Sequence, residues 1–126
     1  MKEQEVHMLD NEDQMAVDLL VRLGMSTHVA KTLLYVSQVD ECQFIDIEKG
    51  ANLRQPQVSL AMQELRRKGW VTKKDVRNKG KGRPIHIYTS NVEICDVLDD
   101  FECKKKEEFE TIQGDITSLK EVLITR

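Results

Sequence analysis

The sequence predicts a mainly helical α+β fold, and three of its features lead to this prediction. Apolar residues repeat at the spacing of one helix face, at Val58, Ala61, Met62 and Leu65. Two β-prone runs follow this helix and flank a basic, glycine-rich segment, which is the pattern of a β-hairpin. No proline interrupts residues 91–126, where apolar residues recur three and four apart. A long helix should therefore follow the hairpin.

Length and composition restrict the class of protein. With 126 residues, the chain is long enough for one small domain and one appended helix. It is 40% hydrophobic and 33% charged, which is typical of neither disordered nor membrane proteins. No apolar run approaches the roughly 18 residues needed to span a bilayer. The polar, acidic start differs from a secretory signal, so we expect a cytoplasmic protein without membrane contact.

Three short helices are predicted in the first half of the chain. One spans residues 12–23, and the next is capped by Ser26 or Thr27 and runs to about residue 39. The third ends near Gly50. Together with the helix and hairpin that follow, this order is complete for a winged helix-turn-helix, in which the hairpin is called the wing.

The chain is expected to have three parts. Residues 1–10 should form a flexible N-terminus, residues 11–90 a DNA-binding winged helix-turn-helix domain, and residues 91–126 a C-terminal helix. A capping box at Ser90–Glu93 should begin that last helix. The polar break at residues 40–43 lies where such a domain often has a small first strand.

The helix predicted over residues 55–68 has a polar face opposite its apolar stripe. Pro56 suits its first turn, and Lys68 with Gly69 suits its end. In a winged helix-turn-helix this helix can enter the major groove of DNA, where amide side chains suit contact with adenine. The candidate residues for base readout are Gln55, Gln57, Ser59, Leu60 and Gln63.

Charge is segregated along the chain. Residues 54–83 carry ten Lys or Arg and two acids, a net charge of +8, so the rest carries −11 of the total of −3. Such segregation is typical of a phosphate-contacting surface. The candidate DNA-backbone residues are Arg54, Arg67, Lys73, Lys74, Arg77, Lys79, Lys81 and Arg83.

Other interpretations of these side chains stay open. The cations of the hairpin could merely keep the hairpin solvated. Similarly, Arg66, Arg67 and Lys68 could stabilise the helix C-terminus without touching DNA. Trp70 is interpreted as a core or hinge aromatic residue rather than one that stacks on bases.

The final helix carries a narrow apolar seam. The seam residues are Leu98, Phe101, Phe109, Ile112, Ile116, Leu119 and Leu123. A charged run at residues 104–108 interrupts the seam, and Gly114 weakens the helix. Because the seam extends beyond a small domain, we expect the helix to pair with a second copy in a parallel or antiparallel coiled coil. The alternative is that the helix folds back onto its own domain.

Nothing in the sequence predicts catalysis. The three histidines are dispersed, and no Cys/His cluster has the spacing of a metal site. We therefore expect no metal, no cofactor and no enzymatic activity. Cys42, Cys95 and Cys103 fit reduced thiols better than disulfides, with a thiol switch at Cys95 and Cys103 as the alternative.

Three stretches resemble winged-helix transcriptional regulators of the archaeal TrmB-like type and, more loosely, of the MarR and ArsR groups. They are GMSTHVAKTLLYVS, FIDIEKGANLRQPQVSLAMQELRRKGWV and GKGRPIHIY, and the resemblance covers about residues 23–90. It implies a recognition helix that carries the five candidate readout residues and a wing around residues 79–83. Leu60 departs from the family, whose members often have a polar or basic residue there.

Two functions follow from these expectations. The first is a homodimeric, sequence-specific DNA-binding transcription regulator whose partners are double-stranded DNA and a second copy. The second is a winged-helix module that binds an acidic protein or RNA, which Leu60 favours. The sequence identifies no small-molecule effector.

Overall fold

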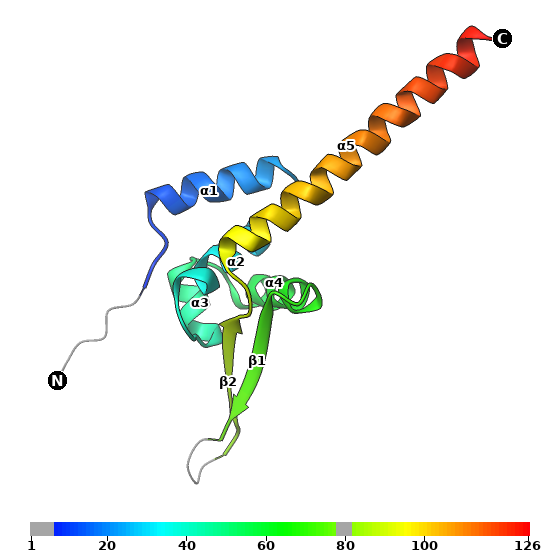
Figure 1. Cartoon of the computed structure of the whole chain (residues 1–126). Helices are drawn as coiled ribbons and strands as arrows, with labels where there is room; N and C mark the ends of the chain where they lie inside the picture. The colour runs from blue at the N-terminus through cyan, green and yellow to red at the C-terminus, as the bar shows by residue number, and fades with distance from the viewer. Residues whose placement is uncertain (1–6, 78–81) are drawn as a thin grey trace. The chain divides into compact units, whose positions relative to one another are not determined.

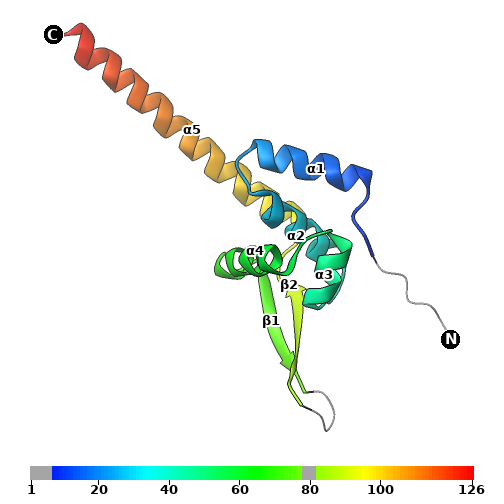
Figure 2. The same cartoon turned by 180° about the vertical axis from the view of Figure 1, so that it is seen from behind.

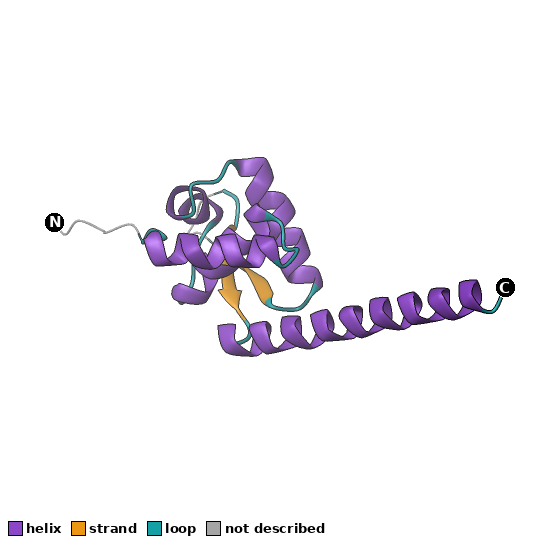
Figure 3. Ribbon diagram, turned by 90° about the horizontal axis from the view of Figure 1, so that it is seen from above, coloured by secondary structure: helices purple, strands orange, loops and turns teal. Residues whose placement is uncertain are grey.

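The computed structural model describes residues 7–77 and 82–126. The elements, in order, are α1 (Asn11–Arg22), α2 (Thr27–Gln38), α3 (Phe44–Gly50), α4 (Gln55–Arg67), β1 (Val71–Val76), β2 (Ile85–Ser90) and α5 (Ile94–Ile124) (Figure 1). Figure 3 shows how strongly helix predominates over the one pair of strands. The mainly helical α+β prediction is confirmed. The chain divides into two compact units, residues 1–93 and 94–126.

Helix α2 is central to the first unit, where it packs against α1, α3 and α4. Ala30, Leu33 and Val36 of α2 are at most 2% exposed. Val17 of α1 and Ile47 of α3 are equally well covered. Because each short helix contributes a few apolar side chains to one shared centre, the helices stabilise one another through burial rather than through their own propensity.

Helix α4 begins and ends as its sequence predicts. Pro56 lies in the first turn, where its missing N–H costs no hydrogen bond. The predicted apolar stripe is buried. Lys68 is the C-terminal cap residue, and Gly69 follows with a φ of +81°, a conformation that glycine adopts without strain.

The hairpin pairs β1 and β2 antiparallel, from Val71 opposite Ser90 to Val76 opposite Ile85. Figures 1 and 2, seen from opposite sides, both show the hairpin pointing away from α2, α3 and α4. At its base, the backbones of Cys42 and Tyr88 exchange two hydrogen bonds of 3.1 and 2.8 Å. This isolated bridge lies where the polar break predicted a small first strand.

The segment before α1 is held against the end of α3. The Leu9 N–H donates to the Gly50 carbonyl at 3.0 Å, and His7 Nε2 lies 2.6 Å from Gln38 Oε1. A side chain on Gly50 would overlap the Tyr35 ring and the backbone oxygen of His7. Residues 7–10 of the expected flexible terminus thus make contacts that join residues far apart in sequence.

The capping box predicted at Ser90–Glu93 is not formed. Ser90 is the last residue of β2, its hydroxyl donates to the Val92 carbonyl at 2.8 Å, and α5 begins at Ile94. Strand pairing with Val71 holds Ser90 in extended backbone, so tertiary structure overrides the local motif. Helix α5 then continues for 31 residues.

Among the described helices, none combines the length and the apolar character that crossing a membrane requires.

Candidate nucleic-acid interface

The polar face of α4 is open to solvent. Gln55, Gln57 and Gln63 are exposed, Leu60 is 56% exposed, and Ser59 is half-buried. The opposite face fills the core, so the side chains predicted for base readout share a surface that an external partner can contact. No disulfide covers this face among the described residues.

Gln57 has a structural task that the sequence did not reveal. Its Oε1 accepts a hydrogen bond of 3.0 Å from the backbone N–H of Arg54, the residue that precedes the helix. A Gln three residues after the cap makes this bond in a capping box. The signal was hidden because Arg54 stands where a capping Ser, Thr or Asp would have pointed to it.

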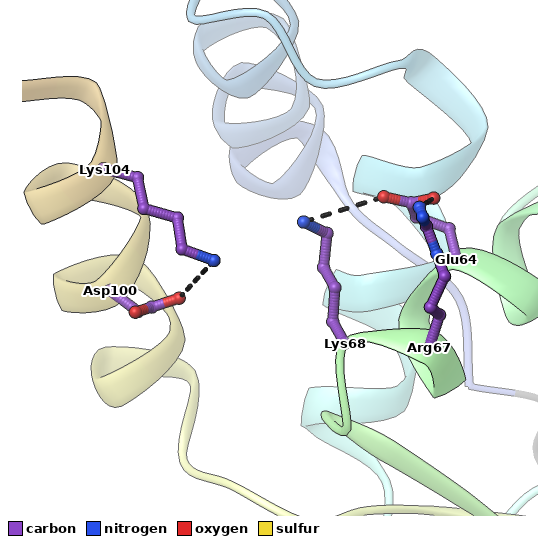
Figure 4. Close-up of polar contacts among 5 residues, drawn as sticks. All are labelled: Glu64, Arg67, Lys68, Asp100 and Lys104. Atoms are coloured by element: carbon purple, nitrogen blue, oxygen red, sulfur yellow. Dashed lines mark hydrogen bonds and ion pairs between the residues drawn. The ribbon is translucent and has the colours of Figure 1, made fainter. Parts of the chain in front are cut away.

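The acid of α4 pairs with two cations at the end of the same helix, which leaves one positive charge in excess. Glu64 forms an ion pair with Arg67 and a second with Lys68, whose Nζ lies 3.6 Å from Glu64 Oε2 (Figure 4). The hydrogen bond from Arg67, together with the charges of Arg67 and Lys68, outweighs desolvation and holds the pKa of Glu64 below its usual value. Arg67, predicted to contact the DNA backbone, is therefore already paired within its own helix.

Lys68 and Trp70 join this helix end to the hairpin. Lys68 Nζ lies 5.2 Å from the centre of the Trp70 ring, a distance typical of cation–π contact. The Trp70 side chain is only 8% exposed, as the core interpretation predicted. Helix and hairpin are thus connected through a buried aromatic residue.

The acid of the hairpin is also paired. Asp75 and His86 lie opposite each other in the register, and Asp75 Oδ1 is 2.6 Å from His86 Nδ1. Glu64 and Asp75 are the two acids between positions 54 and 83. Glu64 is paired with two cations, whereas Asp75 is hydrogen-bonded to the ring of His86.

The remaining predicted backbone residues are exposed cations. Within residues 7–77 and 82–126, none of them forms an ion pair: Arg54, Lys73, Lys74, Arg77 and Arg83. Lys73 and Lys74 point to opposite faces of the hairpin because side chains alternate along a strand. The predicted residues Lys79 and Lys81 lie outside the described residues.

Helix α5 carries the predicted seam on an exposed surface. Phe109, Ile112, Ile116, Leu119 and Leu123 are between 47% and 58% exposed. Earlier in the helix, Leu98 is 40% exposed and Phe101 is half-buried.

The charged run that interrupts the seam consists of ion pairs within α5. Lys104 pairs with Asp100 at 3.4 Å (Figure 4), and Lys106 pairs with Glu102 at 3.6 Å. These pairs follow the helical spacing of four residues, at which opposite charges attract.

The cysteines differ in environment. Cys42 is buried, and this burial raises the pKa of its thiol to about 12, whereas Cys95 and Cys103 are exposed and free. Among the described residues, no group of three His, Cys, Asp or Glu side chains is placed to hold a metal ion.

Comparison with known proteins finds similarity in structure. No protein-family model matches the chain, and no curated protein sequence matches it. TrmBL2, an archaeal chromatin protein, superposes with a TM-score of 0.66 at 17% identity, over 89% of this chain and 40% of TrmBL2. A MarR-family transcriptional regulator from Silicibacter pomeroyi superposes with a TM-score of 0.51 at 18% identity, over 90% of this chain and 84% of that one.

The chain thus spans less than half the length of TrmBL2 and most of the MarR-family protein. At these identities the likeness concerns the fold alone. The order of helices, the hairpin after α4 and these superpositions agree, and the first unit of this chain has the winged helix-turn-helix fold.

Proposed function

We propose that the protein is a homodimeric, sequence-specific DNA-binding transcription regulator. In this proposal α4 enters the major groove, and the wing, residues 77–84, contacts the phosphate backbone or the minor groove. The observation that carries the proposal is the exposed amide face of α4, next to exposed cations that have no ion-pair partner among the described residues. TrmBL2, which has a described mode of DNA binding, adds support.

The cations and the amides have separate roles. Lys and Arg release counterions from DNA and so provide affinity for any sequence. Base edges are distinguished by hydrogen-bonding side chains in the groove, and the amides of α4 are of this kind. A dimer would place two α4 helices on two half-sites, so the preferred DNA should have two-fold symmetry.

The test selects bound fragments from a random double-stranded library in the presence of competitor DNA. A two-fold symmetric sequence should emerge, and its affinity should fall steeply with salt. Selection of no sequence would contradict the proposal.

A pair of double variants tests the wing. Lys74→Ala with Arg77→Ala removes two exposed cations of the hairpin and should lower the salt slope of log affinity by about 1.8, at about 0.9 per phosphate contact. The control, Lys104→Ala with Lys106→Ala, removes the same charge from α5, where both lysines already pair with acids. An equal decrease of the salt slope in both double variants would show that DNA affinity depends only on the net charge of the protein.

One observation favours a second candidate function. Leu60 exposes 56% of its surface in the centre of the polar face, where it offers a partner an apolar contact and neither a hydrogen-bond donor nor an acceptor. In that case the basic surface binds an acidic protein or RNA instead of DNA. Competition of these ligands against the selected DNA distinguishes the two functions.

A further inference from the structure

The amide of Gln57 is oriented by its hydrogen bond to the helix cap. The donor is the backbone N–H of Arg54, so only the oxygen of the Gln57 amide can accept, and Oε1 is fixed 3.0 Å from this nitrogen. Arg54 has extended backbone, with φ −95° and ψ 159°, and makes no side-chain hydrogen bond to the helix. Gln57 therefore supplies the hydrogen-bond acceptor for the backbone N–H of the cap residue of α4.

This bond changes what Gln57 can offer to a partner. A free amide presents one acceptor and one donor side by side, which matches the N6 donor and N7 acceptor of adenine. The Gln57 oxygen has a second lone pair, but its position is fixed at the Arg54 N–H, whereas Nε2 keeps both of its N–H donors for a partner. In the described part of the chain, the side chains of Gln55 and Gln63 form no such bond, so both keep the complete amide pattern.

We propose that Gln57 acts in the DNA complex only as a hydrogen-bond donor and selects guanine, while it also caps α4. This inference rests on the proposed function, with α4 in the major groove. Guanine presents two neighbouring acceptors, N7 and O6, in that groove. Cytosine presents a donor there and should be rejected most strongly at the position that Gln57 contacts.

Two substitutions separate the two roles of Gln57. Gln57→Glu keeps an oxygen acceptor for the Arg54 N–H and loses the donor. Gln57→Lys loses the acceptor and keeps a donor, and lysine contacts guanine at the same two atoms. The same two changes at Gln55, which lies in the same first turn of α4 and makes no capping bond among the described residues, are the controls for charge.

The experiment measures thermal unfolding and selects preferred DNA from a random library for each variant. Gln57→Glu should keep the wild-type Tm and lose guanine at one position, by about fivefold or more in relative affinity. Gln57→Lys should keep guanine there and lower the Tm by about 4–8 °C. Gln55→Lys should lower the Tm by less than Gln57→Lys, because it loses no capping bond.

Different failures have different meanings. If wild-type protein selects a sequence but no position changes in the Gln57 variants, or if that position is adenine, the inference is overturned and the proposed function stands. The capping half is overturned if Gln57→Glu destabilises as much as Gln57→Lys. If wild-type protein selects no sequence, the proposed function fails and the inference fails with it.

Discussion

Helices α4 and α5 both carry an apolar stripe, but only one of the stripes is covered. In α4, Val58, Ala61 and Leu65 are 0% exposed. In α5, Phe109 and Ile116 are 58% and 47% exposed. The comparison teaches that a periodic stripe predicts a covered face without telling which chain covers it. For α4 the cover comes from its own unit, and for α5 we propose a second copy.

The largest expected effect is on the stability of the first unit. Leu65→Ala removes a fully buried side chain and should lower the free energy of unfolding by about 2–5 kcal/mol. Leu60→Ala, in the same helix but 56% exposed, should change it by less than about 0.5 kcal/mol. Chemical denaturation of both variants measures the difference, and similar losses would contradict the assignment of the two faces.

The contrast between covered and exposed side chains extends to the thiols. With a pKa of about 12 instead of the ordinary 9.0, Cys42 should have about a thousandfold less thiolate at pH 8. Alkylation followed by mass spectrometry should modify exposed Cys103 in the native protein and Cys42 only after unfolding.

The same raised pKa links Cys42 to stability at high pH. The unfolded chain releases this proton at a lower pH than the folded chain, so the free energy of unfolding should fall as pH rises from 9 toward 12. If Cys42 is alkylated rapidly in the native protein, before any unfolding, both its burial and its raised pKa are contradicted.

The proposed cover of α5 can be broken at one seam position. Ile116→Asp places a charge in the seam and should raise the dissociation constant of the dimer about a hundredfold, because two apolar side chains lose their burial and two acids meet. Ser118→Asp adds the same charge away from the seam and should have little effect. Sedimentation measures both variants, and a monomeric wild-type protein would remove the proposed dimer.

A smaller effect is expected at the end of α4. Glu64→Gln removes the acid that pairs with Arg67 and Lys68, so DNA affinity should rise severalfold and its salt slope should steepen by about 0.9 for each cation that reaches a phosphate. Glu110→Gln makes the same change of net charge in α5. Fluorescence anisotropy at several salt concentrations compares them, and an unchanged slope would mean that neither cation contacts DNA.

The smallest effect is expected within α5. Gly114→Ala should stabilise the helix by up to about 1 kcal/mol, because alanine has the higher helix propensity and the added carbon would meet nothing within 4 Å beyond the adjacent helix backbone. Circular dichroism during heating measures the gain. A loss of helix would indicate that a partner approaches this position closely.

Much of the fold could be predicted from local patterns. The spacing of Val58 and Leu65 located α4 and its buried face, and Gly69 located its end. Ser90 was misinterpreted because its role depends on pairing with Val71, which no local motif records. The contacts of residues 7–10 could not be predicted for the same reason, since their partners lie in α2 and α3.

The candidate site was less accessible to sequence reasoning. Composition located the basic segment and periodicity located the exposed amides, but neither could show that Glu64 pairs with Arg67. The Asp75–His86 pair depends on the register of the hairpin, which the length of its connection left open. The bond that orients Gln57 depends on the backbone conformation of Arg54.

The absence of a side chain at Gly50 also limits which substitutions relatives of this chain can carry. Alanine at position 50 would still suit α3, yet its methyl group would displace the Tyr35 ring or the backbone at His7. The segment before α1 and the end of α3 therefore constrain each other. A relative that has lost this glycine should also have a different path into its first helix.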